Sequence, residues 1–261
     1  MCGMDLEPLL RFWRAQDDLF DRVDPAWWGA VVSDPRYPRI QEPNYARVET
    51  PQPVGLGEID DLLLPAMGRS GSGRGHVVIF HPEDQTDLVV EASTRGERIV
   101  WDLVMGHDGD GVDGDPRVRE AHDLDARFWA AHRASMRWFD IVEEVVLDEL
   151  QAIERDVLVP AGRRWFVVTG SDGVEGLAAL LVLEGVGYLD HVVIFPPSRR
   201  RGLASALARH AVAAASAAGA RQTYLLAEPG GVAAGLYERI GFSALTQIAS
   251  WISELAPPVA G

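Results

Sequence analysis

Cysteine is almost absent from this chain, since Cys2 is the only one in 261 residues. A single cysteine excludes an internal disulfide and a zinc site built from several thiolates. The chain also lacks an apolar run of about 18 residues, the length that a membrane-spanning helix needs. Its first residues do not show the basic and then apolar pattern of a signal peptide. These absences predict a cytoplasmic protein with no membrane partner.

Positive charge is scarce. The sequence has 24 Lys and Arg against 39 Asp and Glu, which gives a formal net charge of −15. Nucleic acids bind basic surfaces, so this balance argues against a nucleic-acid partner. Against that background, Arg199, Arg200 and Arg201 form a local basic spot.

Several common active-site motifs are missing. The chain has no Gly-x-Ser-x-Gly, no His-Glu-x-x-His and no Gly-x-x-x-x-Gly-Lys-Ser/Thr pattern. Residues 106–115 are almost all Gly and Asp, but Val112 breaks the spacing of a calcium loop. We therefore predict no metal and interpret residues 106–116 as a linker between residues 1–105 and a domain at 117–255.

Hydrophobic periodicity predicts a mixed α/β (α+β) fold, in which a central β-sheet is flanked by helices. Asp24-Pro25 suggests the start of a short helix over 25–32. The expected helices are 5–22, 25–32, 57–67, 84–94, 125–135, 140–155, 202–218 and 231–239, and the expected strands are 45–49, 76–80, 98–105, 117–121, 164–169, 176–183, 188–195, 223–227 and 242–251.

The two halves contain a weak internal repeat. His76-Val-Val-Ile-Phe80 is identical to the segment from His191 to Phe195. A second alignment, which we prefer, places strand 76–80, helix 84–94 and Gly96 against strand 223–227, helix 231–239 and Gly241. In that alignment Ala92 stands opposite Tyr237. Either way the first half lacks the basic turn, so we interpret it as a degenerate copy.

The segment from Tyr188 to Gly219 predicts an anion site. An apolar strand ends at Pro196-Pro197, a basic turn follows, and a long helix begins. The first N–H groups of a helix have no partners and carry partial positive charge, so they suit a phosphate. Gly202 and Ala204 keep large side chains away from this backbone.

Two motifs resemble those of one family. Arg199-x-x-Gly202-x-Ala204 is similar to the Arg/Gln-x-x-Gly-x-Gly/Ala turn of the GNAT acyltransferases. Ala233-x-x-Leu236-Tyr237, followed by Gly241-Phe242, resembles the second motif of that family. The resemblance covers roughly 118–255. The chain also looks like actinobacterial GNAT proteins that carry a degenerate GNAT-like half at the N-terminus.

The resemblance implies a GNAT fold and an acyl-CoA, most simply acetyl-CoA, as the donor. The pyrophosphate would lie on the backbone of the basic turn, and the pantetheine arm would hydrogen-bond to the edge of the strand. Most members have Gly at the position of Arg200. An L-residue such as Arg is tolerated there only if its φ stays negative. The cofactor residues would be Val193, Ile194, Arg199, Arg200, Arg201, Gly202, Leu203 and Ala204.

Tyr237 is the candidate acid, because a phenol can protonate the leaving thiolate; the alternative is a packing tyrosine. The candidate bases are Asp190, His191 and Glu228. His191 has a side chain suited to accept a proton near neutral pH, or it is a satisfied core histidine. Glu228 could instead cap the following helix.

The sequence thus predicts an N-acyltransferase that acts on a primary amine of a small molecule or peptide. A non-catalytic acyl-CoA-binding or scaffold protein is the alternative, and a binding module for another phosphorylated ligand is the third interpretation. The acceptor, the acyl chain and the oligomeric state, a homodimer included, stay open.

Overall fold

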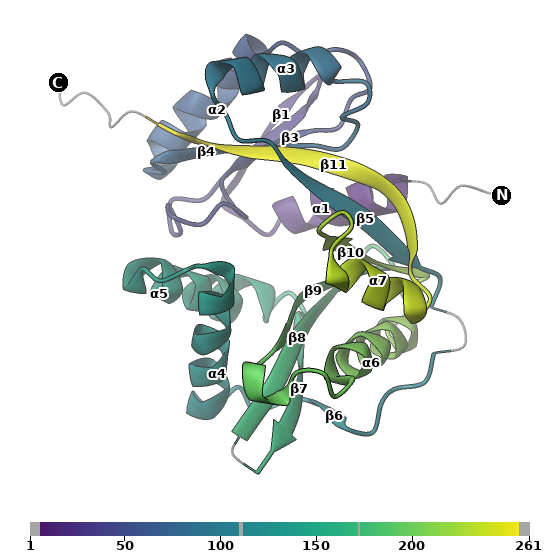
Figure 1. The fold of residues 1–261 in the computed structure, drawn as a ribbon. Coiled ribbons are helices and arrows are strands. Elements are labelled where there is room, and N and C mark those ends of the chain that lie inside the picture. The colour runs from purple at the N-terminus through teal and green to yellow at the C-terminus, as the bar shows by residue number, and fades with distance from the viewer. Residues whose placement is uncertain (1–5, 110–111, 172, 256–261) are drawn as a thin grey trace. The chain divides into compact units, whose positions relative to one another are not determined.

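The computed structural model describes residues 6–109, 112–171 and 173–255 (Figure 1). It confirms the mixed α/β fold class. The helices are α1 (Glu7–Asp17), α2 (Leu56–Ser70), α3 (Thr86–Arg95), α4 (Ala126–Met136), α5 (Glu144–Ile153), α6 (Leu203–Ala217) and α7 (Val232–Arg239), with short helical turns η1 (Arg137–Phe139), η2 (Glu154–Leu158) and η3 (Pro196–Ser198). The strands are β1 (Arg22–Ala26), β2 (Gly29–Ser33), β3 (Tyr45–Val48), β4 (Arg74–Ile79), β5 (Val100–His107), β6 (Val118–Glu120), β7 (Arg164–Gly170), β8 (Gly173–Leu183), β9 (Val186–Ile194), β10 (Gln222–Ala227) and β11 (Ser243–Glu254).

The chain forms two compact units that exchange segments. One unit contains residues 1–15 and 104–245, and the other contains 16–103 and 246–261. Strands β5 and β11 each begin in one unit and end in the other. The division of the sequence into 1–105 and 117–255 describes the two halves of the proposed internal repeat, not these compact units. It stays a prediction.

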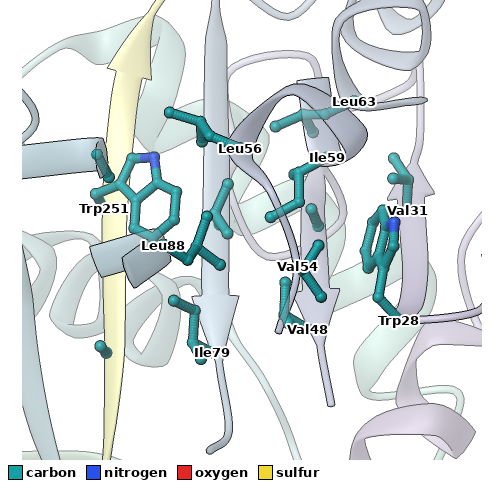
Figure 2. Close-up of a cluster of buried hydrophobic side chains, with 14 of the residues drawn as sticks. Trp28, Val31, Val48, Val54, Leu56, Ile59, Leu63, Ile79, Leu88 and Trp251 are labelled. Atoms are coloured by element: carbon teal, nitrogen blue, oxygen red, sulfur yellow. The ribbon is translucent and has the colours of Figure 1, made fainter. Parts of the chain in front are cut away.

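In the unit of residues 16–103 and 246–261, the strand order is β1-β2-β3-β4-β11. Strand β11 pairs antiparallel with β4, and Trp251 lies opposite Val77. Helices α2 and α3 supply apolar side chains to a core that also contains Trp28 and Trp251, both about 1% exposed (Figure 2). The last strand of the chain therefore completes the core of its first half.

The predicted helix over 25–32 is wrong, because these residues form the β1–β2 hairpin. Pro25 is tolerated since β1 is an edge strand, where a missing N–H breaks no ladder bond. Gly29 has a φ of 152°, and a Cβ there would lie 1.8 Å from the Arg47 carbonyl oxygen. Tertiary pairing with β3 thus overrides the local helix-start signal.

In the unit of residues 1–15 and 104–245, the order is β5-β10-β9-β8-β7-β6. Side chains alternate between the two faces of this sheet, as strand geometry requires. Trp165 and Val167 face α4 and share a cluster with Phe128, whereas Phe166 faces α6 and contacts His210. Helices α4 and α6 therefore cover opposite faces of β7 to β9 (Figure 1).

We expect Trp251→Ala to lower the free energy of unfolding by about 3–5 kcal/mol, because it removes a fully buried aromatic side chain from the core of the unit that contains α2 and α3. Ile252→Ala is the matched control, since Ile252 is its neighbour on β11 but 45% exposed. Urea denaturation followed by circular dichroism measures both. Equal losses in the two variants would contradict the assignment of Trp251 to this core.

Candidate active site

Strands β9 and β10 pair only at their beginnings. The parallel register joins Val186, Gly187 and Tyr188 to Gln222, Thr223 and Tyr224, while β9 continues to Ile194 and β10 to Ala227. Past Tyr188, the backbone groups of β9 that point away from β8 have no ladder partner on β10. The strand edge that was expected to hold the pantetheine arm thus has no strand partner on this side, although the carbonyl of Ile194 accepts a hydrogen bond from the side chain of Arg199.

A β-bulge lies in the open part of β9. Leu177 pairs with Val193 and Ala179 pairs with Asp190, so β9 takes three steps where β8 takes two. His191, in the extra position, has a φ of 53°, which is uncommon for a residue other than Gly. A bulge redirects side chains, and here it places the two adjacent candidate bases in the opening.

Asp190 is the end of a chain of buried polar contacts. Arg163 binds Asp190 through one guanidinium nitrogen and Glu154 through another, at 2.5 and 3.2 Å. Glu154 also accepts a hydrogen bond from the indole N–H of Trp165. Arg163 and Glu154 are buried, whereas the side chain of Asp190 is 47% exposed. Burial alone would raise the pKa of Asp190, but Arg163 and His191 hold it below its usual value, so it is a carboxylate at neutral pH.

Ser135 on α4 fixes the proton on the His191 ring. Its hydroxyl lies 2.6 Å from the His132 carbonyl oxygen and 2.6 Å from Nε2 of His191. The hydroxyl has one hydrogen, and the carbonyl can only accept it. Nε2 must therefore carry the ring proton and donate to Ser135, which leaves the lone pair on Nδ1.

His132 and His191 stack at 5.6 Å within a group of aromatic rings. His132 is fully buried, and neither ring nitrogen has a hydrogen-bond partner among the residues described. Burial, together with the nearby His191 and Arg163, lowers the pKa of His132 to about 3. Burial also lowers the pKa of His191 to about 4, although Asp190 opposes this shift. Both rings are neutral at pH 7.

Tyr237 on α7 is 8% exposed, and its ring packs edge-on against Phe242 at 5.7 Å. Burial raises the pKa of Tyr237 to about 12, and the negative charge of Asp190 contributes to the shift. The phenol thus keeps its proton throughout the physiological range. Its electrostatic coupling to Asp190 links α7 to the bulge on β9.

The basic turn leads into α6 through two left-handed residues, Arg200 with a φ of 66° and Gly202 with a φ of 73°. The prediction that Arg200 has a negative φ is wrong, because Arg200 adopts the left-handed conformation that glycine prefers. A Cβ on Gly202 would meet nothing within 4 Å. The turn and the first N–H groups of α6, including those of Leu203 and Ala204, form a concave backbone surface of the kind that binds anions.

The three arginines do not share one role. Arg199 donates to the Ile194 carbonyl at 3.0 Å, and its guanidinium lies 4.7 Å from the Trp138 ring centre. Arg201 forms an ion pair with Glu175 at 2.7 Å. Both thus hold the turn in place, which leaves the backbone and Arg200 as the groups best suited to an incoming phosphate.

Glu228 follows β10 and is exposed. Its backbone carbonyl accepts from Gly231, but α7 has no side-chain cap. The structure therefore does not bear out Glu228 as a side-chain cap. It places Asp190 beside His191, and near enough to Tyr237 for its charge to raise the pKa of the phenol. The roles of all four residues stay predictions.

Sequence reasoning missed Ser135, His132 and Arg163. No motif marks them, because they come from α4 and from the residue before β7, far from β9 along the chain.

Within the ranges that the structure describes, His81, Glu83 and Asp84 could each offer one metal ligand atom within 4.8 Å of the others. Glu83 and Asp84 are exposed, and exposed acidic side chains commonly lie together without binding an ion. We therefore assign no metal to this cluster. No helix in the described part of the chain is long and apolar enough to cross a membrane.

Comparison with known proteins identifies a family for part of the chain. The acetyltransferase (GNAT) family model matches residues 122–242, which include the bulge, the turn and Tyr237. Residues 122–242 therefore form a domain of the GNAT superfamily, whose chemistry is acyl transfer, generally from an acyl-CoA to an amine. A search of curated proteins found no match to the chain.

Solved structures share the fold at low identity. A conserved protein of unknown function from Staphylococcus epidermidis is 10% identical, with a TM-score of 0.72 over 97% of this chain and 98% of its own. A GCN5-related N-acetyltransferase from Kribbella flavida is 14% identical, with a TM-score of 0.61 over 98% of each chain. A tandem GNAT protein from the clavulanic acid biosynthesis pathway is 12% identical, with a TM-score of 0.52 over 73% of this chain and 67% of its own. These likenesses support the fold alone.

We expect His132→Phe to make stability less sensitive to acid. The pKa of His132 is lower in the folded state than in the unfolded chain, so the unfolded chain binds more protons and stability is lost as pH falls below about 6.5. Phe fits the aromatic surroundings and does not titrate. Between pH 4 and 6 the slope of unfolding free energy against pH should fall by up to about 1.4 kcal/mol per pH unit.

Urea titrations at several pH values measure this slope. His122→Phe is the matched control, because the side chain of His122 is 80% exposed. An unchanged slope in His132→Phe would show that His132 can be protonated in the folded protein.

Proposed function

We propose that the protein is an acyl-CoA-dependent N-acyltransferase of the cytoplasm, which transfers an acetyl or another short acyl group directly to a primary amine. The observation that carries this proposal is the open edge of β9. It leads from the cluster of Asp190, His191 and Tyr237 at one end to the anion-binding turn at α6 at the other. An extended donor with a phosphate at one end and a thioester at the other fits that layout.

The donor supplies an activated acyl group. The amine nitrogen attacks the carbonyl carbon, a C–N bond forms and the C–S bond breaks. Nδ1 of His191, which has the lone pair, accepts the ammonium proton directly or through water, while the charge of Asp190 attracts the cationic acceptor. Tyr237, which holds its proton, donates it to the departing thiolate, and the second proton that the acylated nitrogen loses returns to the Tyr237 phenolate. The products are an amide and free CoA.

The N-terminal half fits a degenerate GNAT-like copy. Gly96 and Gly241 follow α3 and α7 with φ values of 102° and 106°. The next N–H in each case donates to the carbonyl of Ala92 or Tyr237, at 3.0 and 3.1 Å. The two helices thus end alike, as α2 and α6 also do. In our preferred alignment, which stays a prediction, Ala92 stands where the phenol would be. We infer that this half shapes the molecule without performing the chemistry.

Gly202→Glu should abolish CoA binding, because it adds a negative side chain at the start of α6, where the phosphate would lie. Gly219→Glu is the matched control: Gly219 also has a positive φ, 87°, and open space around it, but it follows the far end of the same helix. Calorimetric titration with acetyl-CoA and desulfo-CoA measures both variants. Equal affinity in the two variants, or no binding by the wild type, would count against the site.

Tyr237→Phe should lower turnover by about 100-fold or more, the usual contribution of a positioned acid, with CoA affinity unchanged. Since the pKa of Tyr237 is about 12, the wild type should show no loss of activity from this group up to pH 10. The measurement is release of free CoA across a panel of amines. The chain contains no lysine, so acylation of its own side-chain amines cannot contribute to the signal.

If Tyr237→Phe turned over as fast as the wild type, the tyrosine would be a packing residue. CoA binding without transfer to any amine would favour the alternative, a non-catalytic acyl-CoA-binding protein. Stronger binding of another nucleotide than of CoA would favour a module for a different phosphorylated ligand.

A further inference from the structure

Large apolar side chains are exposed beside the candidate bases. From η1 to the first turn of α5, the side chains of Trp138, Phe139, Val142 and Val145 are 48%, 52%, 62% and 42% exposed. We call these four residues the apolar wall. Exposed apolar side chains that gather in one place mark a binding surface more often than scattered ones do.

The apolar wall contacts the site at two points. The Phe139 ring lies 5.2 Å from the His191 ring, at an interplanar angle of 48°. The Arg199 guanidinium, which belongs to the basic turn, lies 4.7 Å from the centre of the Trp138 ring. The wall is thus continuous with the place where a proton would be accepted and with the turn that would hold the donor.

The charges next to the wall have both signs, because Arg199 lies over the Trp138 ring, whereas Asp190 precedes His191, the ring that Phe139 contacts. The carboxylate of Asp190 is 47% exposed, keeps a low pKa and lies next to His191 in the chain. Both ring histidines are neutral at pH 7 and therefore do not repel a cation. A ligand that fits this surface has a cationic nitrogen for Asp190 and an apolar group for the half-exposed face of Phe139.

Resting on the function proposed above, we propose that the acceptor is a primary amine that carries an aromatic or bulky apolar group. Residues 138–145 then determine acceptor specificity. A small polar amine or a polyamine would leave the apolar wall in water and gain nothing from it. Burying a phenyl group against apolar side chains stabilises a complex by about 2 kcal/mol, or roughly 30-fold in affinity.

The test measures acceptor binding separately from turnover. The free protein, and then the protein with CoA, is titrated with 2-phenylethylamine, ethylamine and putrescine by calorimetry. We expect 2-phenylethylamine to bind at least about 10-fold more tightly than ethylamine. Phe139→Ala should reduce this ratio to about 3-fold or less, while ethylamine affinity stays the same. Val142→Ala, at the most exposed member of the wall, should reduce the ratio by a smaller factor.

Val232→Ala is the matched control, since Val232 is 91% exposed at the start of α7 and lies outside the wall. It should leave the ratio unchanged. Equal affinities for 2-phenylethylamine and ethylamine would overturn the proposal even if acyl transfer is observed. The same holds if Phe139→Ala and Val142→Ala both leave the ratio of these two affinities unchanged. A wild-type dimer that Phe139→Ala converts to monomer in sedimentation would also overturn it, because the wall would then be a subunit interface. Failure to bind CoA would count against the proposed function and not against the wall.

Discussion

The parting of β9 from β10 is the constraint on which the site depends. A parallel pair normally satisfies both strand edges, but here the ladder stops at Tyr188 and Tyr224. The bulge at His191 accompanies this parting and gives β9 a residue that β8 does not match. A backbone edge left without partners in the interior is unfavourable unless another group hydrogen-bonds to it. Arg199 satisfies one such group, the carbonyl of Ile194.

Burial sets the protonation state of each group around this part of β9. It raises the pKa of Tyr237 and lowers the pKa of His191, so both side chains are uncharged at neutral pH. Asp190 stays ionised because Arg163 lies against it, and Arg163 is in turn held by Glu154. The site thus combines a neutral phenol on Tyr237, a neutral imidazole on His191 and an ionised carboxylate on Asp190. Groups whose environments push their pKa values apart are typical of acid–base sites.

The exchange of segments between the two units makes each half depend on the other half of the sequence. The core that contains α2 and α3 includes Trp251 from the last strand. A cut between the halves of the sequence would remove part of a core instead of releasing two complete domains. Sequence reasoning located the halves from a Gly- and Asp-rich stretch, which marks a change in composition but carries no information on which strands pair.

The sequence by itself determined most elements and the fold class, because these follow from local periodicity. It also predicted the phosphate turn and the candidate acid, from motifs whose residues are neighbours along the chain. It did not determine the helix at 25–32, where pairing with β3 overrides the helix-start signal, or the positive φ of Arg200, which the turn imposes. Nor could it find Ser135, His132 and Arg163, or the contact of Phe139 with His191. These residues meet β9 only once α4 and β7 have packed against it. Contacts between distant segments depend on packing, and the pKa of a buried group depends on all the charges that packing brings near it.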